Sequence, residues 1–187
     1  MPPKCKFTKE QIINAALDIT RQSGIDAVTA RAVAIKLDSS SKVIFSLFQN
    51  MEDLQKEVIK AAYECYLSFL QRDLEIDKYP QYKAMGMAYI HFAKEERELF
   101  KCLFMCDRNG NYETAGVDFE MAIDMIMRTN GISREKAELM HLEIWICVHG
   151  IATMYATSYL TLEWEFVSGI LTDIYQGIRS RHLSREE

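Results

Sequence analysis

The sequence has few residues that interrupt helices, with three prolines and eight glycines among 187 residues. This scarcity favours long helices over a fold built from many tight turns. No apolar run approaches the ~20 residues that cross a membrane, and residues 1–11 lack the apolar core of a signal peptide. We therefore expect an all-α protein that stays in the cytoplasm and has no membrane partner.

Cysteine is sparse as well, and the five cysteines are scattered and odd in number, which argues against a disulfide framework. We expect buried small side chains or free thiols. Cys102 and Cys106 lie four residues apart and could share a metal ion or sense oxidation, but no further His or Cys nearby completes a ligand set. His91 and Glu95 have the same spacing and the same lack of further ligands.

The sequence contains no nucleophile and base at a recognisable spacing, no phosphate loop and no complete metal-ligand set. We therefore expect a protein that is not an enzyme and that needs no cofactor. Hydrophobic residues make up 49% of the chain and charged residues 26%, which suits an ordinary globular core.

The net charge of −5 is unevenly distributed along the chain. Residues 1–48 carry seven basic and four acidic side chains, a net charge of +3. The remainder carries 15 basic and 23 acidic side chains, a net charge of −8. A basic end on an acidic body is typical of a protein that places one end against phosphates.

Residues 29–48, TARAVAIKLDSSSKVIFSLF, have the pattern of two short helices joined by a polar turn. Thr29 can cap the first helix. The apolar positions of that helix recur on one face: Ala30, Val33, Ala34 and Leu37. The second helix begins near Ser40 or Ser41 and buries three apolar side chains: Ile44, Leu47 and Phe48. Its small cationic outer face fits a major groove about 12 Å wide, although two ordinary helices with a solvated face remain the alternative.

The other expected helices follow from caps and helical spacing. Thr8 and Gln11 form a capping box, and Gly24 ends the helix that they begin. Pro80 opens another helix, and Ser133 caps a later one. The turn signal Arg-Asn-Gly-Asn occupies residues 108–111. The remaining helices are expected over residues 51–77, from 80, over 98–106, up to 130, over 134–159 and over 162–179, which gives about nine in all.

Ten residues of the N-terminal quarter keep the spacing of a known pattern, sGxxxxTxxxIAxxxGvSxxxlYxhFxxKexL. They are Gly24, Thr29, Val33, Ala34, Ser40, Ile44, Phe45, Phe48, Glu52 and Leu54. On these residues the segment 6–54 resembles the DNA-binding domain of the TetR family of bacterial transcriptional regulators. The resemblance implies a helix-turn-helix domain in residues 1–50 and a helical ligand-binding and dimerisation domain in residues 51–187.

A second, shorter likeness lies in the C-terminal half. Trp145, His149 and Gly150 are similar to a W-x-x-x-H-G element in the ligand-binding domains of one TetR subgroup. Trp145 and His149 lie on one helical face, so both could line a cavity. The alternative for His149 is a buried histidine with a satisfied hydrogen bond.

Three residues depart from the family pattern. Asp38 replaces the turn glycine, and Asp tolerates the left-handed conformation better than most residues. Phe45 replaces a tyrosine and lacks its hydroxyl, and Met51 replaces a lysine. Each phosphate contact that is lost weakens DNA binding and flattens its salt dependence by about 0.9 in log–log slope.

The residues expected to contact DNA are those on the outward face and those that flank it. We expect Lys42 to bond guanine or phosphate, Val43 to touch a thymine methyl group, and Ser41 and Ser46 to make short polar contacts. Solvated surface charge is the alternative for Arg31 and Lys42. The full set is Thr29, Arg31, Ser41, Lys42, Val43, Phe45, Ser46, Lys4 and Lys6.

The resemblance also implies an effector pocket among the middle helices and a homodimer formed by the last two helices. The pocket candidates are aromatic or apolar, and they fit a small apolar or amphipathic effector: Phe69, Tyr89, Phe92, Phe104, Phe119, Ile126, Trp145, His149 and Tyr155. An ordinary hydrophobic core is the alternative for this set. The function implied is a ligand-responsive regulator, a repressor, that binds a palindromic operator. The alternative is a TetR-like dimer with weakened or lost DNA binding that acts through another protein.

Overall fold

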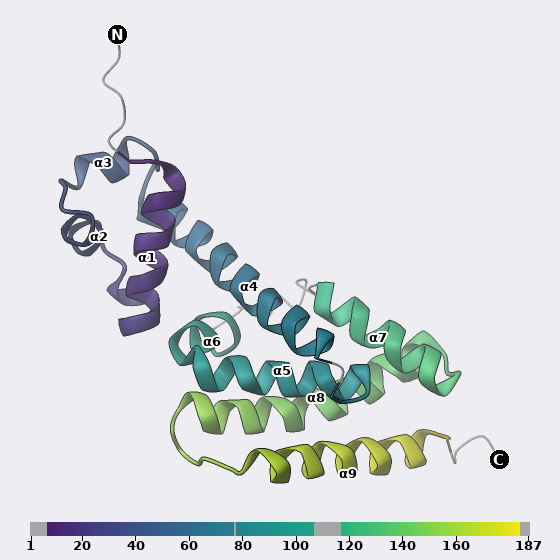
Figure 1. The fold of residues 1–187 in the computed structure, drawn as a ribbon. Helices are drawn as coiled ribbons and strands as arrows, with labels where there is room; N and C mark the ends of the chain where they lie inside the picture. Colours follow the sequence, from purple (N-terminus) through teal and green to yellow (C-terminus); the bar gives the residue numbers. More distant parts are fainter. Residues whose placement is uncertain (1–6, 77, 107–116, 184–187) are drawn as a thin grey trace. The chain divides into compact units, whose positions relative to one another are not determined.

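The computed structural model describes residues 7–76, 78–106 and 117–183. Over these residues the regular structure consists of nine α-helices and one 3-10 helix, without strands (Figure 1). The elements are α1 (Lys9–Ser23), η1 (Ile25–Ala27), α2 (Ala30–Lys36), α3 (Lys42–Phe45), α4 (Met51–Glu75), α5 (Gln81–Glu95), α6 (Arg97–Phe104), α7 (Val117–Asn130), α8 (Arg134–Ala156) and α9 (Trp164–Leu183). The all-α prediction is confirmed.

The helices pack into two compact units. The first contains Met1–Tyr66 and Glu96–Cys106, and the second contains Leu67–Glu95 and Asp107–Glu187. The long helix α4 therefore contributes to both units, and α6 belongs to the first. The expected functional division at residue 50 concerns which part binds DNA and which binds an effector, and it stays a prediction.

The first unit is built from α1, α2, α3, the start of α4 and α6. Its first helix begins as expected, because Gln11 N donates to Thr8 Oγ1 at 3.1 Å and Thr8 N donates to Gln11 Oε1 at 2.9 Å. The helix ends at Gly24, whose φ of +81° and ψ of 167° suit glycine almost alone. The core of this unit consists of side chains no more than 2% exposed: Ile12, Ala16, Val28, Val33, Ile44, Phe48, Leu54, Val58, Ala62, Leu99 and Phe100.

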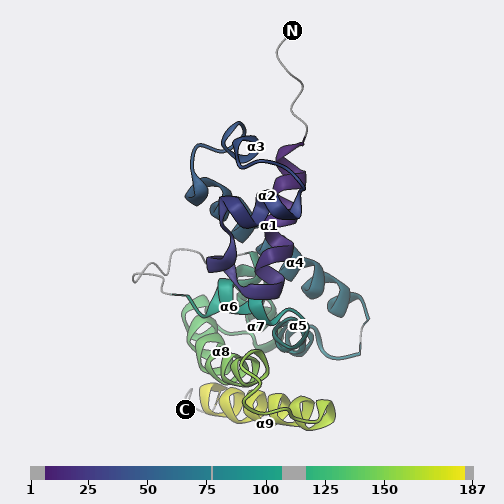
Figure 2. The same cartoon turned by 90° about the vertical axis from the view of Figure 1, so that its left-hand side faces the viewer.

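The second unit is built around α8, which packs against α5, α7 and α9. Both views show α8 and α9 lying side by side (Figures 1 and 2). The most deeply buried side chains of this unit, each no more than 1% exposed, are Ala88, Ile90, Phe92, Ala93, Ala122, Ile123, Ile126, Ala137, Met140, Ala152, Ala156 and Val167.

The end of α8 differs from the expected boundary at residue 159. The helix stops at Ala156 because Ser158 adopts a left-handed conformation with a φ of +57°. Ser158 N then donates to Tyr155 O at 3.1 Å, and the next amide, Tyr159 N, donates to Met154 O at 3.0 Å. These two bonds close a helix end without glycine. The turn signal at residues 108–111 lies outside the described residues.

Candidate functional site

The turn between α2 and α3 is closed by a residue in the left-handed conformation. Asp38 has a φ of +46°. Asp38 N donates to Ile35 O at 3.1 Å, and Ser39 N donates to Ala34 O at 2.9 Å. This pair of bonds usually accompanies a glycine at the end of a helix, and Asp is among the few other residues that reach the conformation. The prediction that Asp38 keeps the turn is confirmed.

The single-turn helix α3 presents a mostly polar face to solvent. Ile44 is 0% exposed and Phe48 is 2% exposed, so they anchor the segment in the core of the first unit. Val43, which is expected to touch a thymine methyl group, is half-buried. The exposed side chains are Ser41, Lys42, Phe45 and Ser46. The structure therefore confirms the predicted orientation of this segment, and the contacts that it makes with DNA remain a prediction.

Thr29 stands at the start of α2, where its Oγ1 accepts a hydrogen bond from Ala32 N at 3.2 Å. The Thr29 hydroxyl therefore caps α2, and its expected contact with DNA stays a prediction. Arg31, on the first turn of α2, is exposed. Lys4 and Lys6, the expected N-terminal arm, lie outside the described residues.

The basic side chains of this region fall into two groups. Lys36 Nζ lies 3.2 Å from Asp18 Oδ2, and Arg21 pairs with acidic side chains as well. By contrast, Arg31 and Lys42 make no ion pair with any residue that the structure describes. Lys9 Nζ lies 5.0 Å from the centroid of the Phe48 ring. The unneutralised positive charge of α2 and α3 is therefore carried by Arg31 and Lys42, as a phosphate-facing surface requires.

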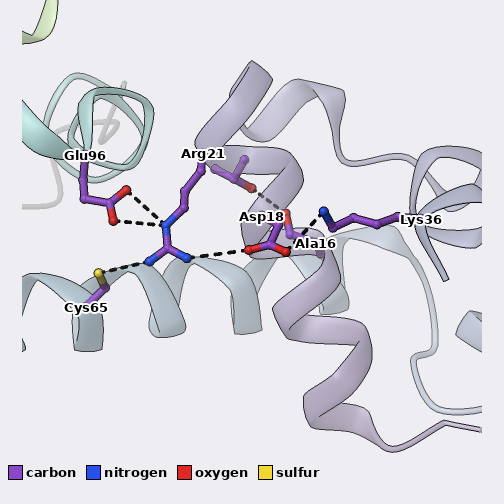
Figure 3. Close-up of polar contacts among 7 residues, drawn as sticks. Ala16, Asp18, Arg21, Lys36, Cys65 and Glu96 are labelled. Carbon is purple, nitrogen blue, oxygen red and sulfur yellow. Dashed lines mark hydrogen bonds and ion pairs between the residues drawn. The ribbon is translucent and has the colours of Figure 1, made fainter.

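One guanidinium group joins α1 to α4 and to the residue before α6 in the first unit (Figure 3). Arg21 Nε, on α1, lies 3.1 Å from both carboxylate oxygens of Glu96, the residue before α6. Its Nη2 lies 3.5 Å from Cys65 Sγ on α4, and its Nη1 lies 3.7 Å from Asp18 Oδ1. Arg21 thereby fixes the end of α1 against α4 and the start of α6.

The network shifts the proton affinities of its members. Burial alone disfavours the charged guanidinium, but the hydrogen bond and charge of Glu96 outweigh it and raise the pKa of Arg21. Burial, together with the charge of Glu96, raises the pKa of the Cys65 thiol. The thiol is therefore protonated at neutral pH, and the sulfur accepts a hydrogen bond from Arg21 instead of acting as a nucleophile.

In the second unit, an open apolar groove of about 380 Å³ lies between the last turns of α4 and Met121, near the start of α7. Leucines make up most of its wall, together with the side-chain amide of Gln71 and the carboxylate of Glu75. The lining residues are Leu67, Leu70, Gln71, Leu74, Glu75 and Met121. None of them is among the nine predicted pocket residues. Leu67, Leu70 and Leu74 follow helical spacing on α4, so periodicity could have identified this wall.

Several of the nine predicted pocket residues are brought together by the fold. Tyr89 Oη lies 2.9 Å from His149 Nδ1, and the Trp145 indole stacks on the His149 ring with centroids 4.8 Å apart. Phe69 and Phe92 meet edge to face at 5.4 Å. These contacts join α5 to α8 and α4 to α5. Each of these rings already has a ring partner, so an effector that lies between two of them would have to separate that pair.

The other four predicted pocket residues are spread through the molecule. Phe104 lies in the first unit, 5.3 Å from the Tyr66 ring between centroids. The remaining three lie in the second unit, and each has surroundings of its own. Phe119 packs on His141 at 5.4 Å, Ile126 is 1% exposed, and Tyr155 Oη donates to Leu162 O at 2.6 Å. The role of the set in ligand binding stays a prediction.

A second tyrosine–histidine pair ties α5 to α8. Tyr82 Oη lies 2.9 Å from His141 Nδ1. Burial lowers the pKa of His141 to about 4, although the charge of Asp118 acts in the opposite direction. Burial also raises the pKa of Tyr82. Both groups are therefore neutral at physiological pH and form an uncharged hydrogen bond within the core.

The paired helices α8 and α9 expose large apolar side chains. Those at least 37% exposed are Leu139, Leu142, Trp145, Ile146 and Phe166. Leu139, Leu142 and Ile146 follow helical spacing on α8, and an exposed apolar stripe of this kind often marks an interface. By length and composition, α8 is also long and apolar enough to span a membrane. In this structure 39% of its most apolar 18-residue stretch is buried against the rest of the protein. Packing on α5, α7 and α9 accounts for the buried part of its apolar surface.

The chain matches no protein-family model, and no curated protein matches its sequence. Solved structures do match it. A transcriptional regulator of the TetR family from Vibrio parahaemolyticus has a TM-score of 0.65 and 15% identity, and the alignment covers 90% of this chain and 97% of that one.

A TetR-family member from Streptomyces coelicolor A3 has a TM-score of 0.63 and 14% identity, with 92% of this chain and 98% of that chain covered. A TetR variant from Acinetobacter baumannii AYE, in complex with minocycline, has a TM-score of 0.53 and 19% identity, with 97% of each chain covered. This chain has the TetR fold. At these identities the likeness establishes the fold alone, and the W-x-x-x-H-G element stays a prediction.

Proposed function

We propose that this protein is a ligand-responsive transcriptional regulator, a repressor, that acts in the cytoplasm. It binds a palindromic operator as a homodimer, and a small apolar or amphipathic effector releases it. The observation that carries the proposal is the exposed face of residues 41–46, held outward by the buried Ile44 and Phe48 within a TetR fold. Its action is binding and not catalysis.

The apolar surface of α8 and α9 supports the dimer. Side chains such as Leu142 and Ile146, 51% and 58% exposed, would be covered by the same surface of a second copy. A two-fold dimer presents two copies of α3, which can read half-sites about 34–36 Å apart or at a related spacing. Doubling also doubles the positive charge that Arg31 and Lys42 bring to DNA.

The groove on α4 and α7 supports the effector. Its leucine wall suits an apolar body, and Gln71 and Glu75 offer polar contacts at the same place. The solved A. baumannii TetR variant holds minocycline, a small molecule. An effector that binds one arrangement of the dimer better than another shifts the population and thereby releases DNA.

The test begins with in vitro selection of duplexes from a random-sequence pool by the full-length protein. We expect an enriched inverted repeat whose binding weakens as salt rises. Lys42→Ala should weaken binding and reduce the log–log salt slope by about 0.9 for each copy. Lys60→Ala is the matched control, because Lys60 is 74% exposed on α4 of the same unit.

A second function is favoured by Phe45 and Met51, which lack the hydroxyl and the cation of the family pattern. In that case the dimer has weak or no DNA binding and acts through another protein. Salt-dependent binding to the selected duplex separates the two functions. Failure to enrich any sequence, with the dimer intact, would favour the protein partner.

A further inference from the structure

The exposed face of α3 offers few hydrogen-bond donors, chiefly Lys42 and the hydroxyl of Ser41, the residue before the helix. Lys42 is the one cation within α3, Lys42–Phe45. The Ser46 hydroxyl donates to the Val43 carbonyl at 2.7 Å, which uses the only proton that it can donate. The largest exposed side chain of the helix is Phe45, 50% exposed, whose ring can neither donate nor accept a conventional hydrogen bond.

In the major groove, the C5-methyl group of thymine is the one apolar group that a base pair displays. The edges of the other bases present donors and acceptors, and an apolar ring placed over them would leave those groups without partners. A thymine methyl group loses nothing when a phenyl ring covers it. Among base edges, Phe45 is therefore complementary to thymine.

The charge around Phe45 favours nucleic acid over an apolar protein surface as its partner. Lys42 is three residues away on the same turn, and Arg31 lies on the preceding helix. Neither makes an ion pair within the described part of the chain. Burial of both charges against an apolar protein would be costly, whereas phosphates satisfy them.

We propose that Phe45 is a specificity-determining residue that contacts the C5-methyl group of one thymine in each operator half-site. This inference rests on the proposed operator binding. Loss of one buried methyl group weakens binding about fourfold, so its loss from both half-sites weakens binding about 15-fold.

The experiment uses the duplex selected by the full-length wild-type protein. Deoxyuridine, which lacks the methyl group, replaces each symmetry-related pair of thymines in turn. At one pair we expect about 15-fold weaker binding, from one methyl group in each half-site. Phe45→Ala should bind the thymine duplex more weakly and should lose the difference between thymine and uracil at that pair.

Two further variants separate this role from a loss of structure. Phe45→Tyr keeps the ring and should keep the difference between thymine and uracil. Ile59→Ala, a matched control at a 42% exposed position on α4, should keep both the affinity and the difference.

If uracil binds as tightly as thymine at every pair, or if Phe45→Ala keeps the full difference, the inference is overturned while operator binding stands. Unchanged DNA affinity of Phe45→Ala on every duplex would also overturn it and would assign the exposed ring to another partner. If no duplex is enriched at all, operator binding itself fails and the inference fails with it.

Discussion

Arg21 Nε lies 3.1 Å from both carboxylate oxygens of Glu96, a residue 75 positions further along the chain. Arg21 belongs to α1, which packs against α2, and Glu96 lies between the end of α5 and the start of α6. The pair therefore joins the helix that packs against α2 to the residue before α6, within the first unit.

Removal of this pair should destabilise the first unit. Glu96→Gln takes away the charge while it keeps the shape, and we expect the free energy of unfolding to fall by about 1 kcal/mol, because a charge-assisted bond is lost at a partly buried position. Urea denaturation measures the change. Glu64→Gln, at an exposed position on α4, should leave the midpoint unchanged, and equal midpoints for both variants would contradict the structural role of the pair.

The left-handed turn at Asp38 should tolerate only certain residues. Asp38→Val introduces a β-branched side chain at a φ of +46°, and we expect a loss of about 1–2 kcal/mol in the free energy of unfolding. Asp38→Asn is the control, because Asn reaches this conformation about as easily as Asp. A thermal or urea unfolding series that ranks Val with Asn would show that the turn is not formed.

Stability should depend on pH through His141. The pKa of this group is about 4 in the folded protein and lies near 6.5 in the unfolded chain. Because the folded value is lowered, the stability is fully present above pH 6.5. This stability is lost as the pH falls toward 4, by up to about 1.4 kcal/mol per pH unit. The reason is that His141 binds a proton in the unfolded chain over this range and stays neutral in the folded protein.

The measurement is the free energy of unfolding of wild type and of His141→Gln at several pH values between about 4.5 and 7.5. The variant should lose the part of the slope that His141 contributes. Tyr82→Phe removes the hydrogen bond but keeps the histidine, so it should lower stability and retain the slope. Parallel curves for wild type and His141→Gln would contradict a buried neutral histidine.

The apolar surface of α8 and α9 should hold the dimer together. Ile146→Glu places a charge at a position that is 58% exposed in one copy, and we expect monomers in sedimentation equilibrium together with loss of operator binding. The matched control is Ile59→Glu, since Ile59 is 42% exposed on α4. A fully dimeric Ile146→Glu would place the interface elsewhere.

Local patterns predict the parts of this fold that local chemistry decides. The capping box of Thr8 and Gln11 and the burial of Ile44 and Phe48 follow from spacing within a few residues, and the structure confirms them. The left-handed conformation of Asp38 is expected because the family pattern has a glycine at this position. The end of α8 was missed, because a serine closes it where sequence reasoning expects glycine or asparagine.

Contacts between distant segments could not be predicted in the same way. The Arg21–Glu96 pair joins residues 75 apart, and no periodicity on α1 identifies its partner. The groove combines Leu70 of α4 with Met121 of α7, so it depends on how two helices pack. The nine pocket candidates are mostly aromatic. Aromatic rings also fill ordinary hydrophobic cores, as the 0% exposure of Phe92 illustrates, so the residue type alone does not identify a pocket.

Footprinting of the protein across the genome of its host tests the central claim most directly. We expect protected sites that share an inverted repeat, with half-site centres one helical turn or a multiple of it apart, and weaker protection by Lys42→Ala at the same protein concentration. Protection at no site, by a protein that is present as an intact dimer, would contradict the claim that the outward face of α3 reads DNA.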